Sequence, residues 1–149
     1  MSSKIILPTA YFGPISYYSK IIKNDTPLVE INENFVKQTI RNRCYISGSN
    51  GKLRLTIPKQ KINDTKSISS IKICYFENWQ KIHWNAISSS YNSSPFFTYY
   101  KDDLNVLFQK KEKYLIDLNN KAQNIILKIL QYDKTIQQTS KYEKTGSFI

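Results

Sequence analysis

The chain has 149 residues, of which 40% are apolar and 22% are charged, with 4 glycines and 5 prolines. This length suits one domain, and the composition excludes collagen-like, low-complexity and disordered proteins. Two cysteines, Cys44 and Cys74, exclude a disulfide framework and a cysteine-rich zinc site. The apolar runs are too short to span a bilayer or to form a secretory signal, so we expect a cytoplasmic protein without a membrane span.

The net charge of +11 is concentrated in the middle of the chain. Residues 41–81 carry nine basic and two acidic residues, a net of +7, and include all three arginines of the chain, Arg41, Arg43 and Arg54. The abundant lysine accompanies abundant isoleucine, asparagine and tyrosine, a composition typical of A/T-rich codons, so the lysines alone are weak evidence for nucleic-acid binding. A solvated basic face and an anion-binding patch both stay open.

The first third of the chain has the pattern of a strand, a helix and a second strand. Residues 5–7 form an apolar run that Pro8 ends, and residues 28–31 form another. Between them, Gly13-Pro14 favours the start of a helix. We expect this helix to pack on a sheet through three residues at helical spacing: Ile15, Tyr18 and Ile22.

The middle of the chain is rich in strand formers. Residues 44–46 and 53–57 flank Asn50-Gly51, which predicts a β-hairpin. In its second strand, alternation predicts that Arg54 points outward or into a site and that three apolar residues are buried: Leu53, Leu55 and Ile57. Residues 59–69 are polar and predict a loop, and residues 70–75 predict a further strand.

The remainder reads mostly as helix. Apolar residues at three- and four-residue spacing predict helices over 79–91, from Pro95 with Ser94 as its cap, and over 115–129. The second of these should be lined on one face by Phe96, Tyr99, Tyr100, Leu104 and Leu107. Residues 135–149 predict a weakly structured tail with a weak strand at best. We therefore predict one α/β domain over residues 1–149: a small mixed sheet with a central β-hairpin, then a mostly helical C-terminal half.

His83 is the only histidine, so any imidazole chemistry must use it. Its position on an apolar helix stripe fits a buried structural residue as well as a catalytic base. Cys44, which follows two arginines, is a weaker candidate for a nucleophile, and Asp102-Asp103 is a weak candidate for Mg²⁺. We predict no metal site and no cofactor, because the sequence lacks metal-ligand clusters, GxSxG, P-loop and GxGxxG motifs.

The residues from Lys37 to Arg43 are the most suggestive segment. In an extended strand, Thr39, Arg41 and Arg43 would project from one face. Two guanidiniums side by side form a fork for a phosphate or a carboxylate, so a phosphate-containing small molecule is the expected partner.

The chain resembles the WbqC-like family, and in particular its Bacteroidetes-type members. The resemblance spans about residues 5–140. Its motifs are Leu7-Pro8-Thr9-x-Tyr11-x-Gly13-Pro14, Lys37-Gln38-Thr39-x-Arg41-Asn42-Arg43-Cys44-x-Ile46, Asn50-Gly51, Asn78-Trp79-Gln80-x-x-His83-Trp84-Asn85-Ala86-Ile87, Tyr91-Asn92-Ser93-Ser94-Pro95-Phe96-Phe97 and Tyr100-x-Asp102-Asp103. Similar members usually continue past the Thr139–Tyr142 region by some tens of residues, so the resemblance implies a chain shortened at its C-terminus.

The family takes its name from a gene of O-antigen polysaccharide clusters, and the resemblance therefore implies a transferase-type enzyme of surface-polysaccharide or nucleotide-sugar metabolism. In that hypothesis Arg41 and Arg43 bind the anionic donor and His83 is the general acid or base. The other candidate site residues are Thr39, Asn42 and Trp79 for substrate binding, with Asn85 and Tyr91 beside His83 in the catalytic set. The alternatives are a nucleic-acid-binding module, a protein-binding module, or a remnant of the family whose helix over 115–129 exposes an apolar face.

Overall fold

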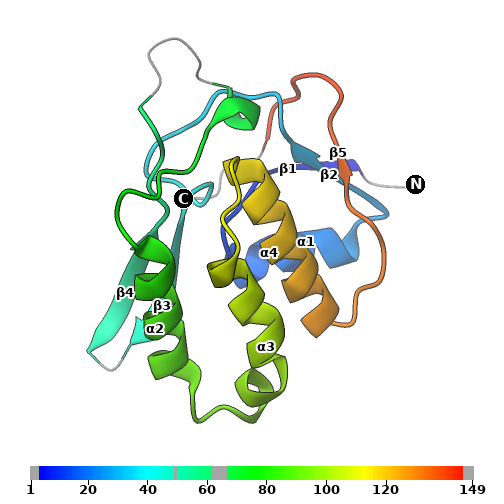
Figure 1. Ribbon diagram of the computed structural model, residues 1–149. Coiled ribbons are helices and arrows are strands. Elements are labelled where there is room, and N and C mark those ends of the chain that lie inside the picture. The colour runs from blue at the N-terminus through cyan, green and yellow to red at the C-terminus, as the bar shows by residue number, and fades with distance from the viewer. Residues whose placement is uncertain (1–3, 49, 62–66, 146–149) are drawn as a thin grey trace.

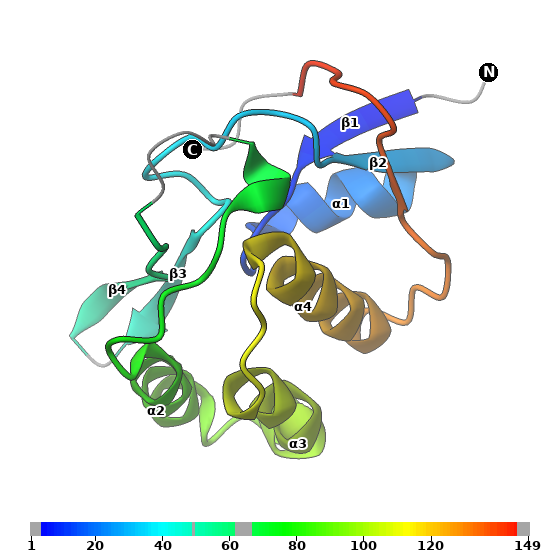
Figure 2. The ribbon, with the colours of Figure 1, turned by 45° about the horizontal axis from the view of Figure 1, so that its top comes forward.

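The computed structural model describes residues 4–48, 50–61 and 67–145 (Figure 1). It confirms the predicted fold class, an α/β protein with small sheets and a helical C-terminal half. The strands form a parallel sheet and a separate antiparallel hairpin. In both views these lie on opposite sides of α4 (Leu115–Ile129) (Figures 1 and 2).

The parallel sheet joins the two ends of the chain. β1 (Lys4–Pro8) pairs along its whole length with β2 (Thr26–Glu30), and the connection between them contains α1 (Ile15–Lys23). The other edge of β2 pairs with β5 (Gln137–Gln138), which is the weak strand expected in the tail. The sheet order is therefore β1-β2-β5, with β2 in the middle.

The expected inward face of α1 is partly wrong. Tyr18 is buried, but Ile15 is 88% exposed and Ile22 is also exposed. The helix buries Tyr17 and Ile21 together with Tyr18, and both tyrosine hydroxyls have backbone partners in residues that precede the helix. That of Tyr17 donates to the Pro8 carbonyl at 2.6 Å.

The hairpin consists of β3 (Arg43–Gly48) and β4 (Gly51–Thr56), and Gly48 pairs with Gly51 across its tip. Gly51 has a φ of +107°, a backbone conformation that glycine adopts without strain. Leu55 and Ile57 are buried as predicted, and Arg54 is exposed. Leu53 is exposed, contrary to prediction, because it lies near the tip of the hairpin, where the strands extend past the core residues.

Two predicted strands are wrong. Residues 37–42 form turns rather than a strand, and β3 begins only at Arg43. Residues 70–75 contain isolated bridges instead of a ladder, after a short 3₁₀ helix, η1 (Ile68–Ser70). Ile71 and Ile73 are both buried, as alternate residues of a strand would be, but among the described residues this segment meets its neighbours only at single bridges, Lys59 to Ile73 and Lys72 to Tyr114. Part of the predicted loop, residues 62–66, lies outside the described residues.

Three helices complete the fold, as predicted. α2 (Trp79–Tyr91) packs on the hairpin, and α3 (Pro95–Gln109) lies between α2 and α4 (Figure 2). Asn78 caps α2, its side chain accepting the Lys81 N–H at 3.3 Å. Ser94 is the N-cap residue of α3, as expected, but its side chain makes no capping hydrogen bond. No helix in the described ranges is long and apolar enough to cross a membrane.

The predicted buried faces of α3 and α4 meet different outcomes. In α3, Phe96 and Tyr99 are exposed, and the buried residues are Phe97, Leu107 and Phe108. The face of α3 that contacts the core is therefore narrower than the set of apolar and aromatic residues at helical spacing predicted. In α4 part of the predicted apolar face is buried, whereas Ile125, Ile126 and Ile129 are half-buried, and the remnant hypothesis stays a prediction. The buried apolar residues of α4 are Leu115, Leu118, Ala122 and Leu127.

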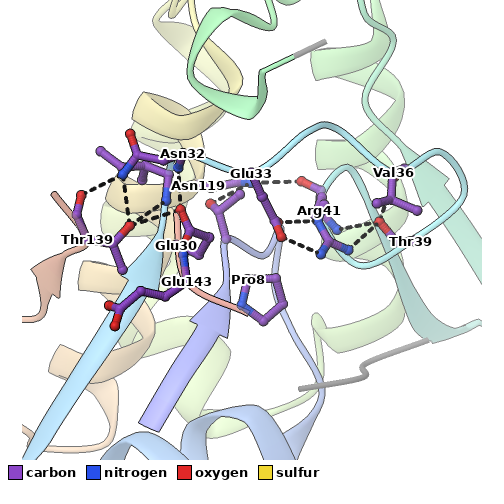
Figure 3. Close-up of polar contacts among 12 residues, drawn as sticks. Pro8, Glu30, Asn32, Glu33, Val36, Thr39, Arg41, Asn119, Thr139 and Glu143 are labelled. Carbon is purple, nitrogen blue, oxygen red and sulfur yellow. Dashed lines mark hydrogen bonds and ion pairs between the residues drawn. The ribbon is translucent and has the colours of Figure 1, made fainter. Parts of the chain in front are cut away.

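The tail is held on the parallel sheet by a buried carboxylate (Figure 3). Glu30, at the end of β2, is fully buried and accepts hydrogen bonds from the Thr139 hydroxyl at 3.0 Å and from the backbone N–H groups of Asn32 and Glu143. Asn32 in turn donates to the Thr139 carbonyl at 2.9 Å. Three donors therefore satisfy this carboxylate without a cation.

Candidate functional site

His83 lies under the hairpin, inside the core. It is 3% exposed, its Nδ1 is 2.8 Å from the Tyr11 hydroxyl, and the edge of its ring meets Trp79 at 5.0 Å between centroids. Burial lowers the pKa of His83 to about 4, while a hydrogen bond to the Thr56 backbone acts in the opposite direction. That second bond uses an imidazole N–H, which leaves Nδ1 to accept from Tyr11.

The Tyr11 hydroxyl keeps its proton and is the donor in this hydrogen bond, because burial raises the pKa of Tyr11 well above its usual value. The neutral imidazole thus joins three distant segments: the loop after β1, the end of β4 and helix α2. Trp79, the other predicted site residue here, is also buried, and its indole N–H has no partner among the described residues.

Arg41 does not stand beside Arg43 as a free fork, contrary to the strand-based prediction. Its Nε and Nη2 donate to the two carboxylate oxygens of Glu33 at 2.6 and 3.1 Å, and both side chains are buried (Figure 3). The Thr39 hydroxyl lies 3.3 Å from Nη1 of the same guanidinium. The structure therefore brings Thr39 and Arg41 together, but in an internal ion pair that leaves no guanidinium edge for a ligand.

Asn42 and Arg43, the next two predicted site residues, lie where β3 begins and are buried or half-buried. Asn42 is buried and donates from Nδ2 to the Ile57 carbonyl at 3.0 Å, which fixes the start of β3 against the end of β4. Arg43 is half-buried, and its Nε is buried with no hydrogen-bond partner in the described part of the chain. Asn85 is exposed on α2, and its place in the catalytic set stays a prediction.

A cavity of about 420 Å³ lies between the hairpin and the three C-terminal helices. Tyr91 is the one predicted site residue that lines it; Arg41, Arg43 and His83 do not. Its described lining consists of apolar side chains, three tyrosines, a serine and a cysteine: Phe12, Cys44, Tyr45, Ile46, Ile87, Tyr91, Ser94, Phe96, Phe97, Tyr100, Leu104, Ile126 and Ile129.

The chemistry of this cavity is that of binding. Its described lining contains no Asp, Glu, His, Lys or Arg, so it has no group that ordinarily exchanges protons near neutral pH. Aromatic rings and aliphatic side chains offer apolar contact, and hydroxyl groups from Tyr91, Ser94 and Tyr100 are of the kind that orients a ligand.

Cys44 is the one thiol in the described cavity lining, and it is buried. Burial raises its pKa from 9.0 to about 12, which lowers the thiolate population at neutral pH roughly a thousandfold. We expect iodoacetamide to alkylate Cys44 at least a hundredfold more slowly in the native protein than in urea, as measured by mass spectrometry on a Cys74→Ser variant. Equal rates in the two states would contradict this and restore Cys44 as a nucleophile candidate.

Phe12 is the cavity-lining residue that the sequence analysis missed most completely. It lines the cavity, stacks on Phe108 with ring centroids 6.5 Å apart, and has a φ of +47°. A positive φ is strained for a bulky side chain and is uncommon outside functional or over-determined positions. The only sequence signal was its place before Gly13-Pro14, within a loop that follows a buried strand.

The acidic pair proposed for Mg²⁺ lies on α3. Asp103 is paired with Lys128 at 3.4 Å, and Asp102 is exposed. Within the ranges that the structure describes, no three His, Cys, Asp or Glu residues are grouped as metal ligands would be.

Of the comparisons with known proteins, the one with protein families gives a match. No curated protein and no solved structure matches the chain. The sequence profile of the WbqC-like protein family matches residues 9–148, which include every residue of the cavity lining and every predicted site residue. Because this match covers nearly the whole chain, the protein belongs to the WbqC-like family.

Proposed function

We propose that the protein binds a sugar-containing ligand in the cavity at the hairpin and serves a group-transfer step of surface-polysaccharide or nucleotide-sugar metabolism. The observation that carries this proposal is the cavity of about 420 Å³, walled by aromatic rings and edged with hydroxyl groups. Membership of the WbqC-like family supports the metabolic setting.

A sugar ring suits such a lining because it has both apolar C–H faces and hydroxyl groups. The rings of Phe12, Phe96 and Phe97 offer apolar surface to the C–H faces. The phenols of Tyr91 and Tyr100 combine an aromatic body with a hydrogen-bonding tip, so they can hold the sugar hydroxyls in register. The volume falls in the range of about 300–1,000 Å³ typical of small-molecule sites.

In this proposal His83 positions the site rather than transferring a proton. Its ring is sealed from solvent, and its hydrogen bonds go to Tyr11 and to the Thr56 backbone. Tyr11 directly precedes Phe12, and Thr56 ends the strand that pairs with Cys44 and Tyr45. Holding these two segments together fixes one wall of the cavity.

Binding by a panel of ligands tests this function. We expect at least one nucleotide sugar or free monosaccharide to bind, as measured by isothermal titration calorimetry and by the rise in melting temperature that ligand binding causes. Tyr91→Phe and Tyr100→Phe should each lower its affinity about two- to tenfold, the value of one hydrogen bond.

Tyr142→Phe is the matched control, because Tyr142 is exposed in the tail and does not line the cavity. This substitution removes the same hydroxyl group and should leave the affinity unchanged. The proposed function fails if no sugar-containing ligand binds, or if the double variant Tyr91→Phe/Tyr100→Phe binds as tightly as the control.

A further inference from the structure

The outward face of the hairpin gathers cations around one aromatic ring. Strand alternation and the register of β3 with β4 place four residues on this face: Arg43, Tyr45, Lys52 and Arg54. Tyr45 and Arg54 are directly opposite each other. The Lys52 ammonium lies 4.4 Å from the centroid of the Tyr45 ring, a cation–π contact, and about half of Tyr45 remains exposed.

In the part of the chain that the structure describes, no carboxylate pairs with these cations. No Asp or Glu occurs between Glu33 and Asp64 in the sequence, so neither strand of the hairpin supplies a carboxylate. In the described structure Arg43, Lys52 and Arg54 form no ion pair, whereas Arg41 is fully engaged by Glu33. In addition, the Nε of Arg43 is buried and has no hydrogen-bond acceptor among the described residues, although buried polar groups are ordinarily hydrogen-bonded. The positive charge on this face therefore lacks both an ion-pair partner and a full set of acceptors.

We propose that this face binds the phosphate groups of a nucleotide: the base stacks on the Tyr45 ring in place of the Lys52 ammonium, and Lys52 and Arg54 contact the phosphates. The proposal rests on the proposed function, which it deepens by assigning the donor's class: a nucleoside diphosphate sugar. Tyr45 connects the two sites, because it lies on the outward face and also lines the cavity. A nucleotide on the hairpin thus brings an attached sugar to the cavity mouth.

A mononucleotide fits this face better than a single-stranded nucleic acid. Tyr45 is the single aromatic residue on the two described strands, which gives one stacking platform and so one base. Proteins that bind single strands track the backbone with several cations and stack successive bases. Lys52 and Arg54 are two residues apart, about 7 Å along the strand, so their long side chains can converge on neighbouring phosphate groups.

The test compares uridine diphosphate, inorganic pyrophosphate, an eight-residue oligothymidylate and the free sugar as ligands of the full chain, at fixed salt, by calorimetry. Lys52→Gln/Arg54→Gln should weaken uridine diphosphate and pyrophosphate at least tenfold. Tyr45→Leu should weaken uridine diphosphate at least fivefold and pyrophosphate less than twofold, because only the nucleotide has a base to stack.

The matched control is Lys81→Gln/Lys134→Gln, which removes the same charge at two exposed positions outside the two strands of the hairpin. It should change each affinity less than twofold. Since Lys52 and Arg54 are exposed, circular dichroism should show that both double variants keep the wild-type fold.

The inference is overturned if Lys52→Gln/Arg54→Gln binds uridine diphosphate as the control does. It is also overturned if the oligothymidylate binds more tightly than uridine diphosphate and gains affinity with length, which would assign the face to single-stranded nucleic acid. Hairpin-dependent binding of uridine diphosphate, with no binding of any sugar and silent Tyr91 and Tyr100 variants, would uphold this inference while refuting the proposed function.

Discussion

Glu33→Ala should lower the free energy of unfolding by about 3–5 kcal/mol, the typical cost of leaving one partner of a buried ion pair uncompensated. Glu33 and Arg41 are both buried and joined by two hydrogen bonds of 2.6 and 3.1 Å. Without the carboxylate, the guanidinium keeps the Thr39 hydroxyl as its side-chain partner among the described residues. Urea denaturation followed by circular dichroism measures the loss.

Two variants make this prediction specific. Glu33→Leu/Arg41→Met removes both charges and should lose less stability than Glu33→Ala, because no buried charge is left behind. Glu77→Ala removes an exposed carboxylate and should change the free energy of unfolding by about 0.5 kcal/mol or less. If Glu33→Ala costs no more than Glu77→Ala, the guanidinium is accessible to water, and Arg41 becomes a ligand-binding candidate again.

Acid should destabilise the protein through His83. The pKa of His83 is lowered from 6.5 to about 4 in the folded state, mainly by burial. Between these values the unfolded chain binds a proton that the folded chain does not, so stability falls as the pH drops from about 6.5 to about 4. At about 1.4 kcal/mol per pH unit, the full loss is about 3 kcal/mol.

His83→Gln isolates this contribution. The variant keeps a polar side chain but removes the titrating group, so its stability should fall less steeply over the same pH interval than that of the wild-type protein. Carboxylates titrate in both proteins towards the acid end, and the difference between the two curves cancels them. Parallel curves would show that the imidazole titrates near its ordinary pKa, in contact with solvent.

Local patterns in the sequence predicted most of the secondary structure. The helices α2 and α4 follow from apolar spacing, and the hairpin follows from Asn50-Gly51 between two alternating runs. Inward faces were harder to predict where aromatic residues occur on several sides of a helix. In α3, spacing alone could not show that Phe97 would be buried and Phe96 exposed.

The site could not be predicted to the same extent, because its contacts join distant parts of the chain. Arg41 pairs with Glu33 across a set of turns that looked like a strand, and His83 is bonded to Tyr11 at a separation of 72 residues. The sequence marked His83 as the single histidine, and the resemblance marked Tyr91 as a catalytic candidate; the structure places Tyr91 at the cavity, and both roles stay predictions. Residue type could not show which arginine would be engaged internally and which would be left on the hairpin surface.

The pairing of β5 with β2 has a consequence for how the protein is made. Glu30 and Thr139 are bonded at a separation of 109 residues, so a nascent chain contains Glu30 and its Asn32 donor long before the Thr139 and Glu143 donors are added. Contacts between such distant segments form late and slowly. Until residues 137–143 emerge, the acid stays hydrated and the edge of β2 stays open, a template to which another unfinished chain can pair.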